Sequence, residues 1–323
     1  VFLSGKRTAF GTFNGVFTTL SANDLGVEAS RAAILQAGVN PGDIDHVVFG
    51  NVMQTSADAI YCARHVGLRC EIPQEVPAVT VNRLCGSGFQ AVITAAEQIV
   101  MGDAKCVVAV GAENMTQAPH SVWGLRTGAA RFGKPPAMVD TLWEALTDSY
   151  CNTPMAVTAE NLAEKYGITR EESDAFGLRS QQKWAAAQEG GFFADELAPV
   201  ELKTRKGTVT FDKDEHPRPQ TTMETLAKLP PVFKKDGVVT AGNASGICDG
   251  GAEVILSRGS AARDRGREGT VHVFHRPQAA LAPVAARIRV AQFQRFPGSR
   301  RRTRRHRRTR PLPVGSLELH LDR

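Results

Sequence analysis

The segment Val79-Thr-Val-Asn-Arg-Leu-Cys85-Gly-Ser-Gly-Phe-Gln-Ala91 joins a short β-branched stretch to an amphipathic one, with a single cysteine at the junction. The following stretch, as far as Gly102, has apolar residues at helical spacing, namely Val92, Ile93, Ala96, Ile99 and Val100. This pattern predicts a strand, a turn at Cys85 and a helix that buries this face and ends at Gly102. Cys106-Val-Val-Ala-Val-Gly-Ala-Glu113 then reads as a second strand, parallel to the first in one sheet.

Cys85 is expected to lie at or just before the N-terminus of this helix. The unpaired backbone N–H groups and the positive end of the helix dipole favour an anion there, so they lower the pKa of a thiol. Gly86 and Gly88 remove side chains from around the sulfur, which leaves room for a bulky substrate. The alternative is an inert, buried cysteine that packs as a small apolar residue.

Several segments resemble one known family. Asn82-Arg-Leu-Cys85-Gly-Ser-Gly-Phe-Gln closely resembles the nucleophile motif of the thiolases, and further segments match that family in the same order. The resemblance is to the mitochondrial-type 3-ketoacyl-CoA thiolases (acetyl-CoA acyltransferases), and it covers residues 1 to about 257. The other matching segments are Lys6-Arg-Thr-Ala-Phe-Gly11, Asp58-Ala-Ile-Tyr-Cys-Ala-Arg-His65, Pro154-Met-Ala-Val-Thr-Ala-Glu-Asn161 and Val239-Thr-Ala-Gly-Asn-Ala-Ser-Gly246.

The resemblance implies a layered α/β fold of the thiolase type, represented by its N-terminal half and its loop domain. It implies a core over residues 1–116, a loop domain that covers coenzyme A over 117–241, and a return to the core over 242–257. Two helices are expected at capping motifs, one after Ser21-Ala-Asn-Asp24 and one from Thr169-Arg-Glu-Glu172 to about Gln188. Between Gln117 and Pro136 the pattern indicates a loop.

The resemblance also implies an activity. Cys85 would attack a 3-ketoacyl-CoA, keep the acyl group as a thioester and pass it to a second CoA, as in fatty acid β-oxidation. Coenzyme A is then a substrate, and no separate cofactor or metal is expected. The family implies a homo-oligomer, a dimer or tetramer, in the mitochondrial matrix, with the cytoplasm as the alternative. No membrane partner is expected, because no apolar run approaches the ~20 residues of a membrane helix.

Four further residues match positions that hold the substrate in the family. Arg218 and Thr221 are candidates for the nucleotide end of CoA, since an arginine can donate two hydrogen bonds to one phosphate. Ser245 matches a position that contacts CoA, and Met155 matches one that lines the acyl pocket. As a lone methionine Met155 would otherwise fill a core. Arg205 and Lys206 instead read as part of a solvated loop.

The family's other active-site motifs do not occur in these 323 residues. The sequence has no Asn-Glu-Ala-Phe or Gly-His-Pro segment, and Cys248-Asp-Gly-Gly251 only imitates the Cys-x-Gly motif. Cys248 is interpreted as structural, and His216 stands in a charged loop. The expectation is therefore that the C-terminal half of the family is missing and that this chain alone does not turn over.

From about residue 258 the composition changes. Residues 1–257 carry a net charge of −7, whereas residues 258–323 contain seventeen arginines, no lysine and a net charge of +13. Such a segment is expected to be disordered. It is interpreted as a frameshift or splice product, a natural extension or a nucleic-acid-binding arm. Nucleic acid is the least favoured, because no aromatic stacking platform accompanies the arginines. A non-catalytic CoA-binding protein is the other alternative to the enzyme.

Overall fold

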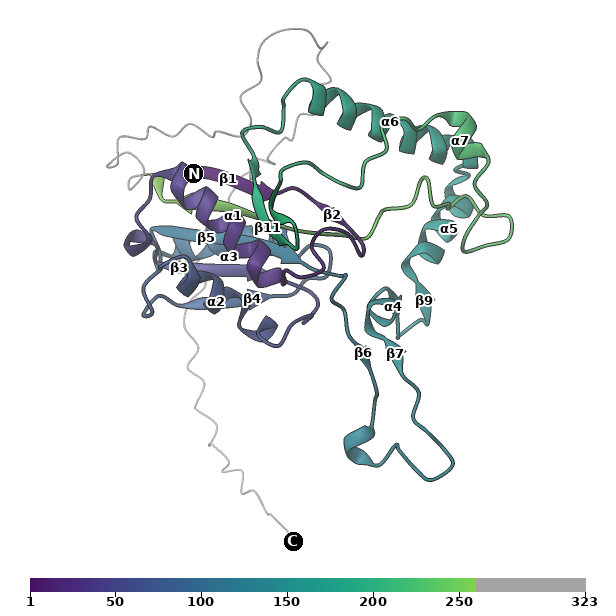
Figure 1. Ribbon diagram of the computed structural model, residues 1–323, viewed down its shortest axis with the longest axis horizontal. Helices are drawn as coiled ribbons and strands as arrows, with labels where there is room; N and C mark the ends of the chain where they lie inside the picture. The colour runs from purple at the N-terminus through teal and green to yellow at the C-terminus, as the bar shows by residue number, and fades with distance from the viewer. Residues whose placement is uncertain (260–323) are drawn as a thin grey trace, which may run out of the picture. The chain divides into compact units, whose positions relative to one another are not determined.

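A seven-stranded sheet is the centre of the structure, a computed structural model that describes residues 1–259, all within one unit of the chain (Figure 1). Six strands follow the order β10-β1-β13-β5-β3-β4, and β2 pairs with β13. Their bounds are β1 Phe2–Thr8, β2 Gly11–Thr12, β3 His46–Gly50, β4 Ala78–Val81, β5 Cys106–Glu113, β10 Leu197–Ala198 and β13 Cys248–Ser257.

The strands before and after Cys85 are parallel, as the sequence predicts. Both β4 and β5 pair in parallel with β3, which lies between them. Parallel strands need a crossover, and helix α3 (Ser87–Met101) provides it. On its other side β5 pairs with β13 in antiparallel fashion, and β13 pairs with β1 in the same way. The sheet is therefore mixed, and the predicted α/β class is confirmed.

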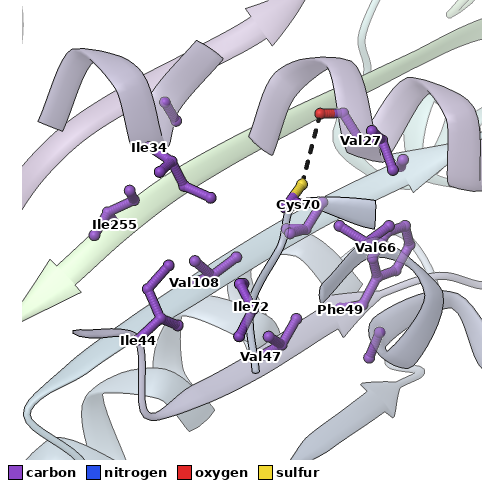
Figure 2. Close-up of a cluster of buried hydrophobic side chains, with 14 of the residues drawn as sticks. Val27, Ile34, Ile44, Val47, Phe49, Val66, Cys70, Ile72, Val108 and Ile255 are labelled. Carbon is purple, nitrogen blue, oxygen red and sulfur yellow. Dashed lines mark hydrogen bonds between the residues drawn. The ribbon is translucent and has the colours of Figure 1, made fainter. Parts of the chain in front are cut away.

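Helices cover both faces of this sheet. Helices α1 (Ala22–Ala37) and α2 (Cys62–Arg69) pack on one face and α3 on the other. Side chains alternate along a strand, so Val47 and Phe49 of β3 enter the α1 cluster, whereas Val48 enters the α3 cluster. Figure 2 shows the α1 cluster, in which α1 and α2 close over Phe49 and Ile255. The sheet thus forms the middle of three layers.

The inward face of α3 agrees with the prediction in part, because Val92, Ala96 and Ile99 are partly buried against the cluster beneath the helix. Its buried residues are Ser87, Ala91 and Ala95, whereas Ile93 and Val100 are exposed. The apolar side of the helix is wider than the part that meets the sheet, so hydrophobic spacing alone could not identify which apolar residues face the sheet. Alanines face the sheet because small side chains let the helix approach it closely.

The predicted helix caps are confirmed. Ser21 caps α1 in a capping box with Asp24, and Gly38 ends the helix with φ 56°. Thr169 and Glu172 form the second capping box, at the start of α6 (Arg170–Glu189). These reciprocal side-chain contacts satisfy backbone N–H groups that have no partner inside the helix.

Between β5 and β13 the chain leaves the main sheet except at β10, which pairs with β1. The predicted loop near residues 117–136 includes β6, which pairs with β7. The predicted domain boundaries stay predictions. The elements of this excursion are β6 His120–Ser121, β7 Val139–Asp140, α4 Thr141–Ala145, β8 Thr147–Asp148, β9 Thr153–Pro154, α5 Met155–Tyr166, α6, β10, β11 Val200–Thr204, β12 Gly207–Phe211 and α7 Met223–Ala227.

The arginine-rich segment beyond residue 259 lies outside the described residues. The expectations about its disorder and its binding to nucleic acid concern that segment and stay predictions. Within residues 1–259, every helix is too short or too polar to cross a bilayer.

Candidate active site

Cys85 is an exposed thiol in the turn between β4 and α3. Gly86 is the N-cap of α3, and Ser87 is its first residue, so Cys85 lies just before the helix N-terminus as predicted. The amide N–H groups of Gly88 and Phe89 have no backbone or side-chain acceptor within residues 1–259. The positive end of α3 therefore lies next to the sulfur-bearing residue.

The turn before Cys85 depends on an unusual backbone conformation at Leu84. Leu84 has φ 47°, a left-handed value that is uncommon for a residue with a side chain. Two neighbours hold it there. The side-chain oxygen of Asn82 accepts a hydrogen bond from the Leu84 N–H (2.9 Å), and the Ser87 hydroxyl donates to the Leu84 carbonyl (2.6 Å). The Ser87 hydroxyl also accepts from the Arg83 N–H (2.9 Å), which closes the turn.

Glycines at the ends of two strands set the position of the helix start. A Cβ atom on Gly50 of β3 would lie 2.4 Å from the Ser87 carbonyl oxygen. A Cβ on Gly111 of β5 would lie 3.2 Å from the Cα of Gly88. The first turn of α3 thus rests directly on the backbone of both strands. Sequence reasoning missed this role, although Gly111 is near the end of a strand that the sequence predicts.

The other cysteines have different surroundings. Burial raises the pKa of the Cys62 and Cys70 thiols to about 12. Burial also raises the pKa of Cys248, the first residue of β13, which pairs with β2. This placement agrees with the structural interpretation of Cys248. Cys151 is exposed, in the turn between β8 and β9.

The CoA candidates Arg218 and Thr221 lie in one tight loop. Arg218 Nη1 donates to the carbonyl oxygens of Glu215, His216 and Pro217 (2.9, 2.8 and 3.1 Å). Thr221 donates from its N–H and its hydroxyl to the Arg218 carbonyl (3.0 and 2.6 Å). These contacts fix the loop with Arg218 exposed to solvent.

Ser245 lies beside this loop. The His216 ring packs against its neighbour Gly246, where an added Cβ would lie 2.1 Å from the ring carbon Cε1. The structure therefore brings the loop of Arg218 and Thr221 next to the turn of Ser245, which is exposed. His216 has a packing role here that the sequence did not indicate.

Met155 is the first residue of α5 and about half exposed, so it does not fill a core. Its expected place in an acyl pocket, like the CoA roles above, stays a prediction. Arg205 and Lys206 form the exposed turn between β11 and β12, as the solvated-loop interpretation expects. Among the described residues, no three His, Cys, Asp or Glu side chains are grouped as a metal ion would require.

Comparisons with known proteins give the same family. The family model described as Thiolase, N-terminal domain matches residues 1–260. The mitochondrial 3-ketoacyl-CoA thiolase of Bos taurus is 52% identical over 255 residues, which are 79% of this chain and 64% of the bovine protein. The chain therefore spans less than two thirds of the length of this relative.

Solved structures agree. The crystal structure of human mitochondrial 3-ketoacyl-CoA thiolase matches with a TM-score of 0.79 at 50% identity, and covers 82% of this chain and 66% of that one. The structure of the human protein in complex with CoA matches with a TM-score of 0.78 at 49% identity, over the same shares. Family model, sequence and fold all agree, and the chain belongs to the thiolase family.

Proposed function

We propose that Cys85 is the nucleophile of an acyl transfer between 3-ketoacyl-CoA and CoA. The observation that carries the proposal is an exposed thiol placed just before the N-terminus of α3. Its thiolate attacks the 3-keto carbon, and the bond between C2 and C3 breaks. Acetyl-CoA leaves as an enolate that takes up a proton, while the shortened acyl group stays on Cys85. The thiol of a second CoA then attacks this thioester and restores Cys85.

The proposed CoA site uses Arg218, Thr221 and Ser245, on adjacent loops. Arg218 keeps its Nε and Nη2 groups without partners within residues 1–259, so they are available to a phosphate. The CoA complex of the human relative supports this class of ligand. Met155 is proposed to line the acyl pocket. The reaction needs no resident cofactor, because the thiol of Cys85 and CoA itself carry the acyl group.

Two further parts of the proposal follow from the relatives. The bovine and human relatives are named as mitochondrial, which supports the mitochondrial matrix as the location. A homo-oligomer is proposed on the family resemblance. Sedimentation of the purified chain would test it, and a strictly monomeric species would contradict it.

We further propose that a polypeptide of these 323 residues transfers an acyl group to Cys85 but does not turn over. The sequence has neither the Gly-His-Pro segment nor a Cys-x-Gly segment in its family context. General acid and base groups contribute about 10²–10⁴-fold each. Thiolysis of acetoacetyl-CoA should therefore be undetectable.

Incubation with acetyl-CoA, followed by mass spectrometry of the intact protein and its peptides, tests the first step. One acetyl group should appear slowly on Cys85, and Cys85→Ser should abolish it. The matched control is Cys151→Ser, which removes the other exposed thiol and should leave the acetyl group in place. Equal labelling of Cys85 and Cys151 would contradict the assigned nucleophile. Steady turnover that depends on Cys85 would show that residues of this chain complete the site.

A further inference from the structure

The carboxylate of Glu113, at the end of β5, holds the segment that follows β3. Glu113 Oε1 accepts hydrogen bonds from the Met53 N–H (3.0 Å) and the Asn51 side-chain amide (3.0 Å), and Oε2 accepts from the Val52 N–H (2.9 Å). The Asn51 amide also donates to the carbonyl oxygen of Ala112 (3.0 Å). Three donors thus converge on one carboxylate, which fixes residues 51–53 against the end of β5.

A second set of contacts runs from this segment to the nucleophile. The Val52 carbonyl accepts a hydrogen bond from the side-chain amide of Asn82 (3.2 Å). The other end of the same amide, its oxygen, accepts from the Leu84 N–H (2.9 Å). Leu84 has the positive φ described above, and Cys85 follows it directly. Asn82 is therefore the link between the segment that Glu113 holds and the turn that presents the sulfur.

We propose that Glu113 is a positioning residue for Cys85, acting through residues 51–53 and Asn82 to hold Leu84 in its left-handed conformation. Such a conformation costs on the order of 1–3 kcal/mol and persists only where its surroundings fix it. The proposal rests on the proposed function only in taking Cys85 as the nucleophile. Glu113 itself does not touch the reacting atoms.

The chemistry of the contact suggests the variant to use. All three partners of Glu113 are N–H donors, so the ionised carboxylate suits them and an amide does not. In Glu113→Gln the side chain keeps its size, but its NH₂ group faces a donor. Burial, with repulsion from Asp249, raises the pKa of Glu113, while the three hydrogen bonds lower it. The charged form therefore depends on these contacts.

The test compares two thiols in one molecule. Cys85 and Cys151 are both exposed, so at one fixed pH the ratio of their alkylation rates with iodoacetamide reports the Cys85 turn and cancels differences in reagent concentration. Glu113→Gln should lower the Cys85 to Cys151 ratio by about tenfold, which corresponds to one charge-assisted hydrogen bond. An unchanged ratio in the folded variant would overturn the proposal.

Asp249→Asn is the matched control. Asp249 is a buried carboxylate on the neighbouring strand β13, and it accepts from the Met115 and Thr116 N–H groups rather than from the segment at 51–53. It should destabilise the fold but leave the ratio unchanged. An equal fall in Asp249→Asn would mean that general loosening explains the effect, and the positioning role would be rejected.

Two further variants keep the proposal testable if Glu113→Gln does not fold. Asn82 is exposed, so Asn82→Ala should fold, and it should lower the ratio as Glu113→Gln does. An unchanged ratio in Asn82→Ala would overturn the proposal. In a Leu84→Gly background the effect of losing Asn82 should shrink to less than half, because glycine adopts a positive φ without steric cost. If replacing Asn82 lowered the ratio as much in the Leu84→Gly background as in wild type, the proposal would also be overturned.

This result is separate from the acyl-transfer test. If wild-type Cys85 takes no acetyl group from acetyl-CoA but Glu113→Gln still lowers its alkylation, the proposed function fails and the positioning role stands. If Cys85 is acetylated and neither Glu113→Gln nor Asn82→Ala changes its alkylation ratio, the function stands and the positioning role fails.

Discussion

Helices α1 and α3 lie on opposite faces of the same sheet, yet they bury very different shares of their residues. Ten of the sixteen residues of α1 are buried, against three of the fifteen of α3. The outer side of α3 is nevertheless apolar, with Phe89 79% exposed and Val100 86% exposed. The fold of residues 1–259 therefore leaves apolar surface of α3 open.

The difference separates two tasks. The α1 face, with Phe49, Val66 and Ile255 fully buried, supplies the larger of the two clusters that flank the main sheet. The α3 face carries Cys85 at its N-terminal end and touches the sheet mainly through small residues. Stability should thus respond to changes on the α1 side, and reactivity and surface behaviour to changes on the α3 side.

The largest expected effect concerns the thiols of the two faces. Cys62 and Cys70 lie in the α1 cluster with pKa values of about 12, so at pH 7 roughly one part in 10⁵ is thiolate, against a few per cent for an ordinary cysteine. Both should react with iodoacetamide about 10³-fold more slowly than Cys85. Peptide mass spectrometry over time measures the rates, with Cys151 as the exposed reference. Comparable rates in the native protein would contradict the assigned burial.

Two phenylalanines test the energetic side of the comparison. Phe49 is fully buried under α1 and α2, whereas Phe89 projects from α3. Phe49→Ala should lower the free energy of unfolding by about 3–5 kcal/mol through lost burial and a cavity. Phe89→Ala should change it by less than about 0.5 kcal/mol. Urea unfolding followed by circular dichroism measures both, and similar losses would mean that the outer side of α3 is covered.

Local features could be predicted from the sequence, and long-range ones could not. The caps Ser21 and Thr169 need only a partner three residues away, so they are visible in the sequence. The place of Cys85 before a helix is local in the same way. The contact of Gly50 with the start of α3 requires β3 to lie beside β4, and nothing near Gly50 in the sequence specifies that pairing.

The same reason explains what was missed at the site. The carboxylate of Glu113 reaches a segment about sixty residues earlier in the chain, so its partners become visible only once β3 and β5 pair. The strand β10 has two residues and no periodicity that would predict it. On α3 the apolar side is wider than the part that meets the sheet, and this hides which apolar residues face the sheet.

A buried carboxyl on the α1 face predicts a pH dependence. Glu253 is 2% exposed, and burial raises its pKa to about 8, although the nearby Ser30 hydroxyl acts to lower it. The folded pKa of Glu253 exceeds the unfolded value of 4.5. Its contribution to the free energy of unfolding is therefore fully present below pH 4.5 and is lost as pH rises through about 8. Glu253→Gln should therefore be more stable than wild type above that pH, by roughly 1–3 kcal/mol.

The measurement is urea unfolding of both proteins across this pH range. Glu113 and Asp249 also have pKa values raised mainly by burial, so the variant should keep part of the slope. Glu97→Gln, an exposed position on α3, is the control and should follow the wild-type curve. If the curves of wild type and Glu253→Gln ran parallel, the pKa of Glu253 would be the same in the folded and the unfolded state, and the prediction would be wrong.

The smallest effect on stability, and the most direct test of the open face, comes from the outer side of α3. The double variant Phe89→Gln with Val100→Gln should bind less of a hydrophobic dye and aggregate less, because contiguous exposed apolar surface promotes both. Its free energy of unfolding should stay within about 0.5 kcal/mol of wild type. Leu35→Gln is the matched control, since Leu35 is 82% exposed on α1 but is the only large apolar side chain exposed to that degree on that helix. If Leu35→Gln lowered dye binding as much as the double variant, or if the wild type bound no dye, the contrast between the two helices would not extend to their surfaces.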